Sequence, residues 1–446
     1  MVRAAMTVPP PGPPPGPLPG TRPERRRGLA PLREVLPNGV RVLASEARTT
    51  PAVALDLSIE AGSICDPDPA PGLASFVSRT IDRGTEQHSA DQIAELLDGR
   101  GVSLVTSITR HTLSLACTCL AEDLDAVLAL LADIVRRPIF PEAEVDTRRG
   151  ELLTRIRQDA EDPAAVATDT LMRLLYGATH PFGRPALGNE DTVGRMTRPE
   201  LVAFHRVHVA PAGLTIALVG DIEPRRAVDA AAAVLADWQT GPVVPVRLAA
   251  PDPAQSRRTE VVRMMSKSQT DVAYGFTSIT RNDPDYYAYW LMNNVLGEYS
   301  LGGRLGDSIR ERQGMSYYVS STLGAGRIPG PLMIRAGVSP ANVARAVASI
   351  DEELTRLVAE GPTDTEVAES KQYLIGSLPR HLETNAGIAG FLQTIEFFGL
   401  GLDYAERLPG LLSAVTRGQV HAAARRALDP AKAAVVVAGP YEGSLA

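Results

Sequence analysis

The stretch 215-TIALVGD-221 returns near the end of the chain as 433-AAVVVAGP-440. Each copy is a short apolar run that ends at a glycine, which is typical of a buried strand followed by a turn. In both halves of the chain, strand patterns come first, helical patterns follow, and this run closes the series. Strands and helices do not alternate strictly, so an α+β fold is favoured over a doubly wound sheet. The sequence therefore predicts two copies of one α+β unit.

The chain has 446 residues, enough for two units of roughly 200 residues each. A proline-rich opening cannot form a packed core, and we predict a disordered tail over residues 1–35. The N-terminal unit is then expected at 36–238, a proline-rich linker at 239–257, and the C-terminal unit at 258–446. In the last of these, helical patterning predicts an unbroken helical stretch over 363–400.

Composition excludes several classes of protein. Hydrophobic residues make up 44% and charged residues 22% of the chain, as in soluble globular proteins. The formal net charge of -7 gives no reason to expect nucleic acid or an anionic membrane as a partner. No apolar run approaches the ~20 residues that span a bilayer, and the opening residues lack the apolar core of a signal peptide. A cytoplasmic location is therefore expected.

Two strands of the first unit can be recognised by alternation. Apolar and polar residues alternate through 53-VALDLSIE-60, the pattern of a half-buried strand. The run 112-TLSLACTCL-120 places Cys117 and Cys119 on its apolar face. Because that face is predicted to be buried, the two cysteines are interpreted as core residues rather than as redox or metal-binding groups. The chain holds three cysteines, too few for a disulfide framework.

The segment 72-GLASFVSRTIDRGT-85 has the spacing of an amphipathic helix. Its apolar residues recur at intervals of three and four and form one face. The opposite face carries Ser75, Ser78, Arg79 and Asp82. This polar face is the first candidate site in the chain.

The same segment resembles the zinc-binding helix of the M16 peptidases, the group of insulinase, pitrilysin and the mitochondrial processing peptidase. In that family the helix reads G-x-A-H-F-L-E-H-x-x-F-x-G-T. The framing residues are kept here as Gly72, Ala74, Phe76, Gly84 and Thr85. The inverted zinc motif H-x-x-E-H is not kept, because its three chemical positions correspond to Ser75, Ser78 and Arg79. The resemblance extends from about Leu36 to Pro440 and implies two homologous M16 domains in one chain.

The resemblance also implies a third zinc ligand, a glutamate that lies roughly 75 to 80 residues later, just before an isoleucine. Here that position corresponds to Arg155, in 152-LLTRIRQDAEDP-163. Serine is a poor zinc ligand, and the fixed positive charge of arginine opposes a dication. We therefore expect no metal site in this chain and no peptidase activity from the chain alone.

A second family motif is kept. Active M16 peptidases carry an arginine and a tyrosine in the pattern R-x-x-x-G-x-x-Y, and these correspond to Arg310 and Tyr317 with Gly314 between them. Such a pair can donate hydrogen bonds to a peptide carbonyl as it gains negative charge. A purely structural alternative is open: Arg310 ends a helix and pairs with Asp307, while Tyr317 packs within a strand.

The resemblance implies one leading function. Some bacterial M16 peptidases divide the work between a subunit that holds H-x-x-E-H and zinc and a subunit that holds the R/Y pair. This chain is expected to be the second kind, a non-catalytic, substrate-binding subunit of a heterodimer that acts on peptides. The alternatives are a structural homologue, like the core proteins of respiratory complexes, or a homodimeric pseudoenzyme that captures peptides. The loop within 296-LGEYSLGGRL-305 is short, which puts a presequence-processing role in doubt.

Overall fold

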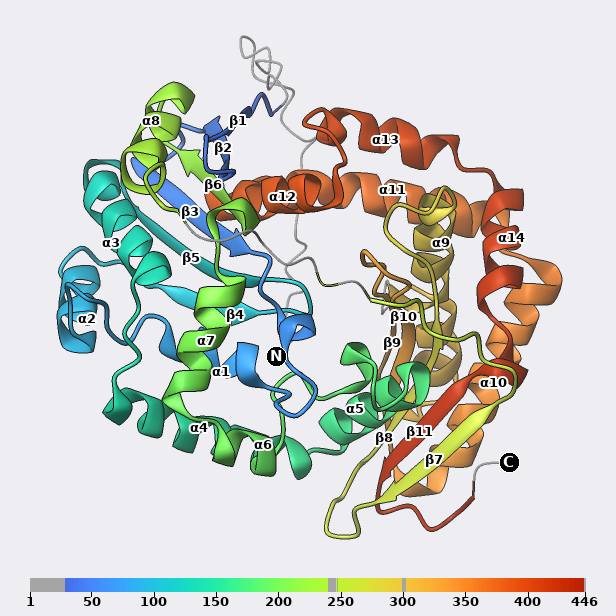
Figure 1. Cartoon of the computed structure of the whole chain (residues 1–446). Helices are drawn as coiled ribbons and strands as arrows, with labels where there is room; N and C mark the ends of the chain where they lie inside the picture. The colour runs from blue at the N-terminus through green and yellow to red at the C-terminus, as the bar shows by residue number, and fades with distance from the viewer. Residues whose placement is uncertain (1–28, 240–245, 247, 299–301, 445–446) are drawn as a thin grey trace, which may run out of the picture.

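The computed structural model describes residues 29–239, 246, 248–298 and 302–444. Most of the expected tail and part of the expected linker lie outside these residues. Among the described residues, no helix combines the length and apolar character that a bilayer span requires. Two mixed sheets face the middle of the molecule, and most helices lie around its outside (Figure 1).

The first sheet has six strands in the order β1-β2-β6-β3-β5-β4. Only β2 and β6 run parallel, and the other neighbours are antiparallel. The strand bounds are β1 Leu32–Val35, β2 Arg41–Glu46, β3 Ala52–Ile59, β4 Val105–Ile108, β5 Leu113–Leu120 and β6 Leu214–Gly220.

The second sheet has five strands in the order β7-β11-β8-β10-β9. Its strand bounds are β7 Arg258–Arg263, β8 Thr270–Thr277, β9 Ser316–Leu323, β10 Pro331–Val338 and β11 Ala434–Gly439. Here β7 and β11 form the parallel pair, and β8 and β10 take the places of β3 and β5. The two repeated segments are therefore equivalent strands, β6 and β11. The predicted pair of α+β units is confirmed.

The helices divide between the two units as follows. The first unit holds α1 Leu73–Thr80, α2 Ala90–Asp98, α3 Leu124–Arg136, α4 Glu142–Ala160, α5 Pro163–Tyr176, α6 Glu190–Arg195, α7 Arg198–His208 and α8 Pro224–Leu235. The second unit holds α9 Tyr286–Asn293, α10 Val343–Glu360, α11 Asp364–His381, α12 Asn385–Phe398, α13 Tyr404–Ala414 and α14 Arg417–Ala427.

Two details of the sequence interpretation are wrong. The helical stretch expected over 363–400 is broken into α11 and α12, because the Thr384 side chain accepts a hydrogen bond from the Gly387 backbone and starts a new helix. The tail was expected to reach residue 35, but Leu32–Val35 forms β1 and pairs with β2. Arg33 on this strand also binds Glu396 of α12, a partner 363 residues away that no local pattern reveals.

Helix α5 belongs to the first unit in sequence but packs on the second sheet (Figure 1). Its residues Leu171 and Leu175 join a buried cluster with Ala273 and Val436 of β8 and β11. Small residues make room for the helix on this face. A Cβ atom at Gly275 would lie 3.1 Å from Cδ2 of Leu171, closer than ordinary packing allows.

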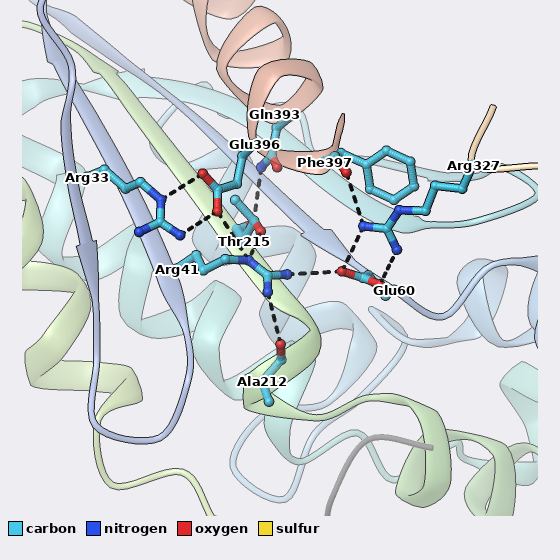
Figure 2. Close-up of polar contacts among 9 residues, drawn as sticks. All are labelled: Arg33, Arg41, Glu60, Ala212, Thr215, Arg327, Gln393, Glu396 and Phe397. Atoms are coloured by element: carbon cyan, nitrogen blue, oxygen red, sulfur yellow. Dashed lines mark hydrogen bonds and ion pairs between the residues drawn. The ribbon is translucent and has the colours of Figure 1, made fainter. Parts of the chain in front are cut away.

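Helix α12 shows the opposite arrangement: it belongs to the second unit in sequence but packs on the first sheet. Leu392 and Ile395 pack against Ala54 and Ala217 of β3 and β6. The polar side of α12 is also anchored (Figure 2). Gln393 donates from Nε2 to the backbone oxygens of Asp56 (2.6 Å) and Thr215 (3.1 Å).

An ion-pair network continues this anchor at the end of α12 (Figure 2). Glu396 accepts two hydrogen bonds from Arg33, both of 2.8 Å. Arg41 donates to Thr215 and Glu60, and Arg327 of the second unit donates to Glu60 over 2.6 Å. Each sheet is therefore covered by a helix of the other unit, and charged groups fix one of these helices in place.

This exchange predicts that the two units unfold together. Leu392→Ala should lower the free energy of unfolding by about 2–5 kcal/mol, because it leaves a cavity at a side chain with no exposed area. Calorimetry of wild type and variant should each show one transition that covers both units. Two separate transitions in the wild type, or loss of the second unit alone in the variant, would contradict this interlocking.

Candidate functional site

Helix α1, which carries the positions of the missing zinc motif, is held in place without a metal. Asp66 precedes it and accepts hydrogen bonds from the backbone N–H groups of Gly72 and Ala74, both over 2.7 Å. Gly72 adopts φ +97°, and a Cβ atom there would lie 2.5 Å from the backbone oxygen of Leu187. The framing glycine is therefore required by close packing rather than by metal binding.

The zinc-motif positions of α1 are mostly buried. Ser75 has no exposed area, and its hydroxyl has no hydrogen-bond partner among the described residues. Ser78 is 4% exposed and donates to the backbone oxygen of Ser75 over 3.0 Å. Arg79 is half-buried at the end of the helix. The face predicted from the amphipathic pattern exists, but it faces protein rather than open solvent.

The third expected position lies on α4, which packs against α1. Arg149 of α4 lies 5.5 Å from the ring centroid of Phe76 on α1, so the two helices are neighbours at this level. Arg155 lies farther along α4, where its side chain is 58% exposed and pairs with Asp159 over 2.9 Å. Two hydroxyls and two guanidinium groups do not fit a zinc ion. Within the described ranges, no three His, Cys, Asp or Glu side chains gather as metal ligands.

We predict that the purified chain binds no stoichiometric zinc, as measured by elemental analysis after dialysis. The triple variant Ser75→His, Ser78→Glu, Arg79→His should also fail, because Arg155 still occupies the third ligand position. Adding Arg155→Glu should give zinc binding near one per chain, with circular dichroism as a control for folding. One tight zinc in the wild type would contradict the first statement, and zinc in the triple variant would contradict the assignment of Arg155.

Arg310 and Tyr317 are both accessible. Arg310 lies in a π-helical segment, Gly306–Arg312, with 42% of its side chain exposed. Tyr317 lies near the start of β9 and is 87% exposed. The structural alternative is not supported, because Asp307 pairs with Arg312 over 2.9 Å and Tyr317 does not pack within the strand.

A short turn connects these two residues rigidly. The backbone oxygen of Arg310 accepts from the N–H of Gly314 over 3.0 Å, and Met315 donates to the oxygen of Ile309 over 3.1 Å. Ile309 and Met315 are buried, whereas Gly314 adopts φ +60°, a conformation that favours glycine. The backbone geometry therefore explains why the R-x-x-x-G-x-x-Y pattern has a glycine at this position. Gly314 allows the chain to turn between the arginine and the tyrosine.

Tyr318, the next residue, differs from Tyr317 because its hydroxyl has a partner inside the protein. Its hydroxyl donates to Asp271, and burial together with this carboxylate raises the pKa of Tyr318. Tyr317 points away from that interior partner, as alternation along a strand requires. The exposed phenol is therefore the one that an external group can reach.

Arg304 and Glu366 hold the segment that leads to Arg310. Arg304 donates from Nε and Nη2 to the two oxygens of Glu366 over 2.6 and 2.9 Å, and from Nη2 to the oxygen of Gly361 over 3.0 Å. Burial opposes the charge of Glu366, but the ion pair with Arg304 and the hydrogen bonds from Thr363 together outweigh it and lower the pKa of Glu366 to about 2. This pair fixes the segment against the start of α11.

The sequence interpretation did not identify three of these supporting residues. Asp66 stands six residues before Gly72, too far for a normal N-cap, so no short motif marks it. Arg304 lies close to the R/Y motif in sequence, but its partner Glu366 is 62 residues away, so no short motif marks the pair. Only Glu366 carried a readable signal, since 363-TDTE-366 has the spacing of a capping box, which the structure contains.

The paired state of Glu366 predicts how stability depends on pH. Its pKa in the folded chain lies below the ordinary value of 4.5, so its contribution to stability is present above pH 4.5 and is lost as the pH falls toward 2. Glu366→Gln should therefore destabilise the chain at pH 7 and make a smaller difference at pH 3, measured by urea unfolding. An equal difference at both pH values would show that the charge of Glu366 is not the cause.

Two family models match the chain. The model described as insulinase (peptidase family M16) matches residues 41–188, and the model described as the peptidase M16 inactive domain matches residues 195–374. Together they span most of both units. With the repeated α+β fold and the degenerate zinc helix, these matches show that the chain belongs to the M16 peptidase family.

Known relatives extend over nearly the whole chain. An uncharacterised zinc protease of Mycobacterium tuberculosis is 28% identical over 425 residues, which are 93% of this chain and 94% of that protein. A probable β-subunit of the mitochondrial processing peptidase from Arabidopsis thaliana is 24% identical over 363 residues, 79% and 68% of the two chains. The crystal structure of a peptidase M16 inactive domain from Pseudomonas fluorescens superposes with a TM-score of 0.87 at 28% identity, covering 94% of this chain and 99% of that one.

Proposed function

We propose that this chain is the substrate-binding subunit of a heterodimeric M16 zinc peptidase and that it supplies Arg310 and Tyr317 to the active site of a partner. The observation that carries the proposal is a contrast between two sites. The zinc-motif positions are mostly buried, chemically unfit for zinc, and closed over by packing. The R/Y pair is exposed on a hydrogen-bonded turn, and within the part of the chain that the structure describes the ion pair of Arg310 is a 3.7 Å contact to Glu311.

The proposed role is to stabilise charge. When a peptide carbonyl is attacked, its oxygen gains negative charge, and donors fixed in advance lower the barrier. The guanidinium of Arg310 presents several N–H donors in one plane and can donate two hydrogen bonds to the peptide backbone. The phenol of Tyr317 can donate one more. The partner, an M16 homologue with an intact H-x-x-E-H, would supply zinc and the attacking water.

The substrate would be an unfolded or small peptide rather than a folded protein. Strand β4 lies at one end of the first sheet, and within the described residues it pairs only with β5. Val105 on β4 is 58% exposed. An extended peptide can add to such an edge through main-chain hydrogen bonds. We propose that the complex works in the cytoplasm, which is compatible with the composition of the chain.

A second function deserves a direct test because of the similarity to the Pseudomonas fluorescens inactive domain. In that case the chain would be a structural or peptide-capturing homologue that takes no part in cleavage. The joint exposure of Arg310 and Tyr317 supports the first function, since both hydrogen-bond donors of the family motif are accessible to a bound peptide.

Co-expression with an H-x-x-E-H homologue from the same genome tests the heterodimer. We expect the two chains to co-purify at equal amounts, and we expect a quenched fluorescent peptide to be cleaved only by the pair. If the homologue cleaves equally well without this chain, or if the two do not associate, the proposed division of labour is wrong.

Within that pair, Arg310→Ala and Tyr317→Phe should each lower kcat/KM by about 10²-fold or more, because each removes a donor to the developing charge. Arg312→Ala is the matched control. Arg312 lies two residues from Arg310 with 54% of its side chain exposed, but it is bound to Asp307. The control should keep activity within about twofold. Unchanged turnover in both variants of the pair would remove their assigned role.

A further inference from the structure

We propose that a cavity between the two units is a binding site for a small organic amine with an apolar body. This inference does not rest on the proposed role in peptide cleavage. The cavity has a volume of about 560 Å³, in the range of sites that hold small molecules. It lies between strands β3 and β5, helix α12, and the loop that joins β9 to β10. Both units build it, so it exists only in the assembled chain.

The walls of the cavity are largely apolar. Phe397 and Phe398 come from the end of α12, and Met172 and Phe182 come from the first unit. Arg327, from the loop between β9 and β10, packs on Phe397: its guanidinium lies 3.8 Å from that ring centroid and donates to Glu60 (Figure 2). These walls favour a ligand with an aromatic or aliphatic body.

Asp56 places one carboxylate in this apolar setting. Its side chain is half-buried and makes no ion pair with any described Lys or Arg. Burial raises the pKa of Asp56 to about 6, and the side chain of Gln393 lowers it in part, so the carboxylate is ionised at pH 7.5. A partly desolvated charge without a counter-ion gains free energy when a cation binds beside it.

The nearby arginines cannot supply this cation. Arg110 lines the cavity, but it donates to the backbone oxygens of Pro181 (3.0 Å) and Arg184 (2.9 Å). Arg327 is engaged by Glu60 and by the backbone oxygen of Phe397. Both guanidiniums therefore have other partners, and Asp56 is left for an external one.

Further polar groups favour an ammonium group over a metal ion. Ser58 and Gln393 line the cavity beside Asp56 and offer hydroxyl and amide oxygens, so a primary ammonium can donate to more than one acceptor. A single carboxylate does not suffice for a divalent metal. His111 also lines the cavity, where burial lowers its pKa to about 4 and its Nε2 has no partner among the described residues. It is neutral at pH 7 and does not repel a cationic ligand.

Calorimetric titration with three ligands of one shape tests the proposal. 2-Phenylethylamine should bind at one site per chain at pH 7.5, and at least about tenfold more tightly than the neutral 2-phenylethanol or the anionic 3-phenylpropionate. Asp56→Asn should lower the affinity for the amine by about tenfold or more and leave the alcohol unchanged. Asp98→Asn, at an exposed carboxylate, is the matched control and should change neither.

A second variant checks the location. Phe397→Ala removes apolar wall and should weaken amine and alcohol alike, and the thermal midpoint of each variant should be recorded to confirm folding. The proposal is wrong if the folded wild type shows no saturable amine binding up to about 10 mM. It is also wrong if amine and alcohol bind equally, or if Asp56→Asn binds the amine as the wild type does. Binding of basic peptides but not of the free amine would likewise overturn it.

Discussion

The exchange of helices between the two sheets is the constraint on which the rest of the molecule depends. Each sheet has one face covered by helices of its own unit and the other face covered by α5 or α12 from the opposite unit. A sheet with one apolar face uncovered is unstable in water, so neither unit is complete alone. The exchange also explains why small residues such as Ala54, Ala217, Ala273 and Gly275 lie on the facing strands. They let a helix of the other unit approach closely.

A separate set of contacts, within the first unit, explains how the zinc motif can be lost while the fold is kept. Helix α1 is stabilised by the two hydrogen bonds to Asp66 and by close contact of Gly72 with Leu187. Its apolar residues belong to the core of the first unit. None of these interactions involves positions 75, 78 or 79. Those positions could change from ligands to serine and arginine without removing any support, and the framing residues stay because packing requires them.

Patterns with a short period were enough to predict β3, β5, β6 and β11 and the zinc-motif helix, and the repeated order of these patterns predicted the duplication. Interactions over long separations were not readable. The ion pair of Arg33 with Glu396 on α12 was one of them, and β1 itself, a four-residue strand that pairs with β2, was assigned to the tail. The burial of Ser75 was also missed, since an amphipathic pattern shows which residues share a face but not what covers it. The R/Y pair was recognised by resemblance, and the structure adds its exposure and the reason for Gly314.

The exposure of Tyr317 and the ordered turn beside it bear on where its partner lies. A large aromatic side chain that is 87% exposed gives up most of the free energy that burial would provide. Its neighbour Tyr318 is bound to Asp271, so the strand can accommodate an aromatic residue facing inward. The backbone around the pair is not loose, since the turn from Arg310 to Met315 is closed by two hydrogen bonds and flanked by buried Ile309. Because the backbone of this turn is already fixed, only the side chains must be ordered when a partner binds, and that is the property expected of residues whose partner lies outside the chain.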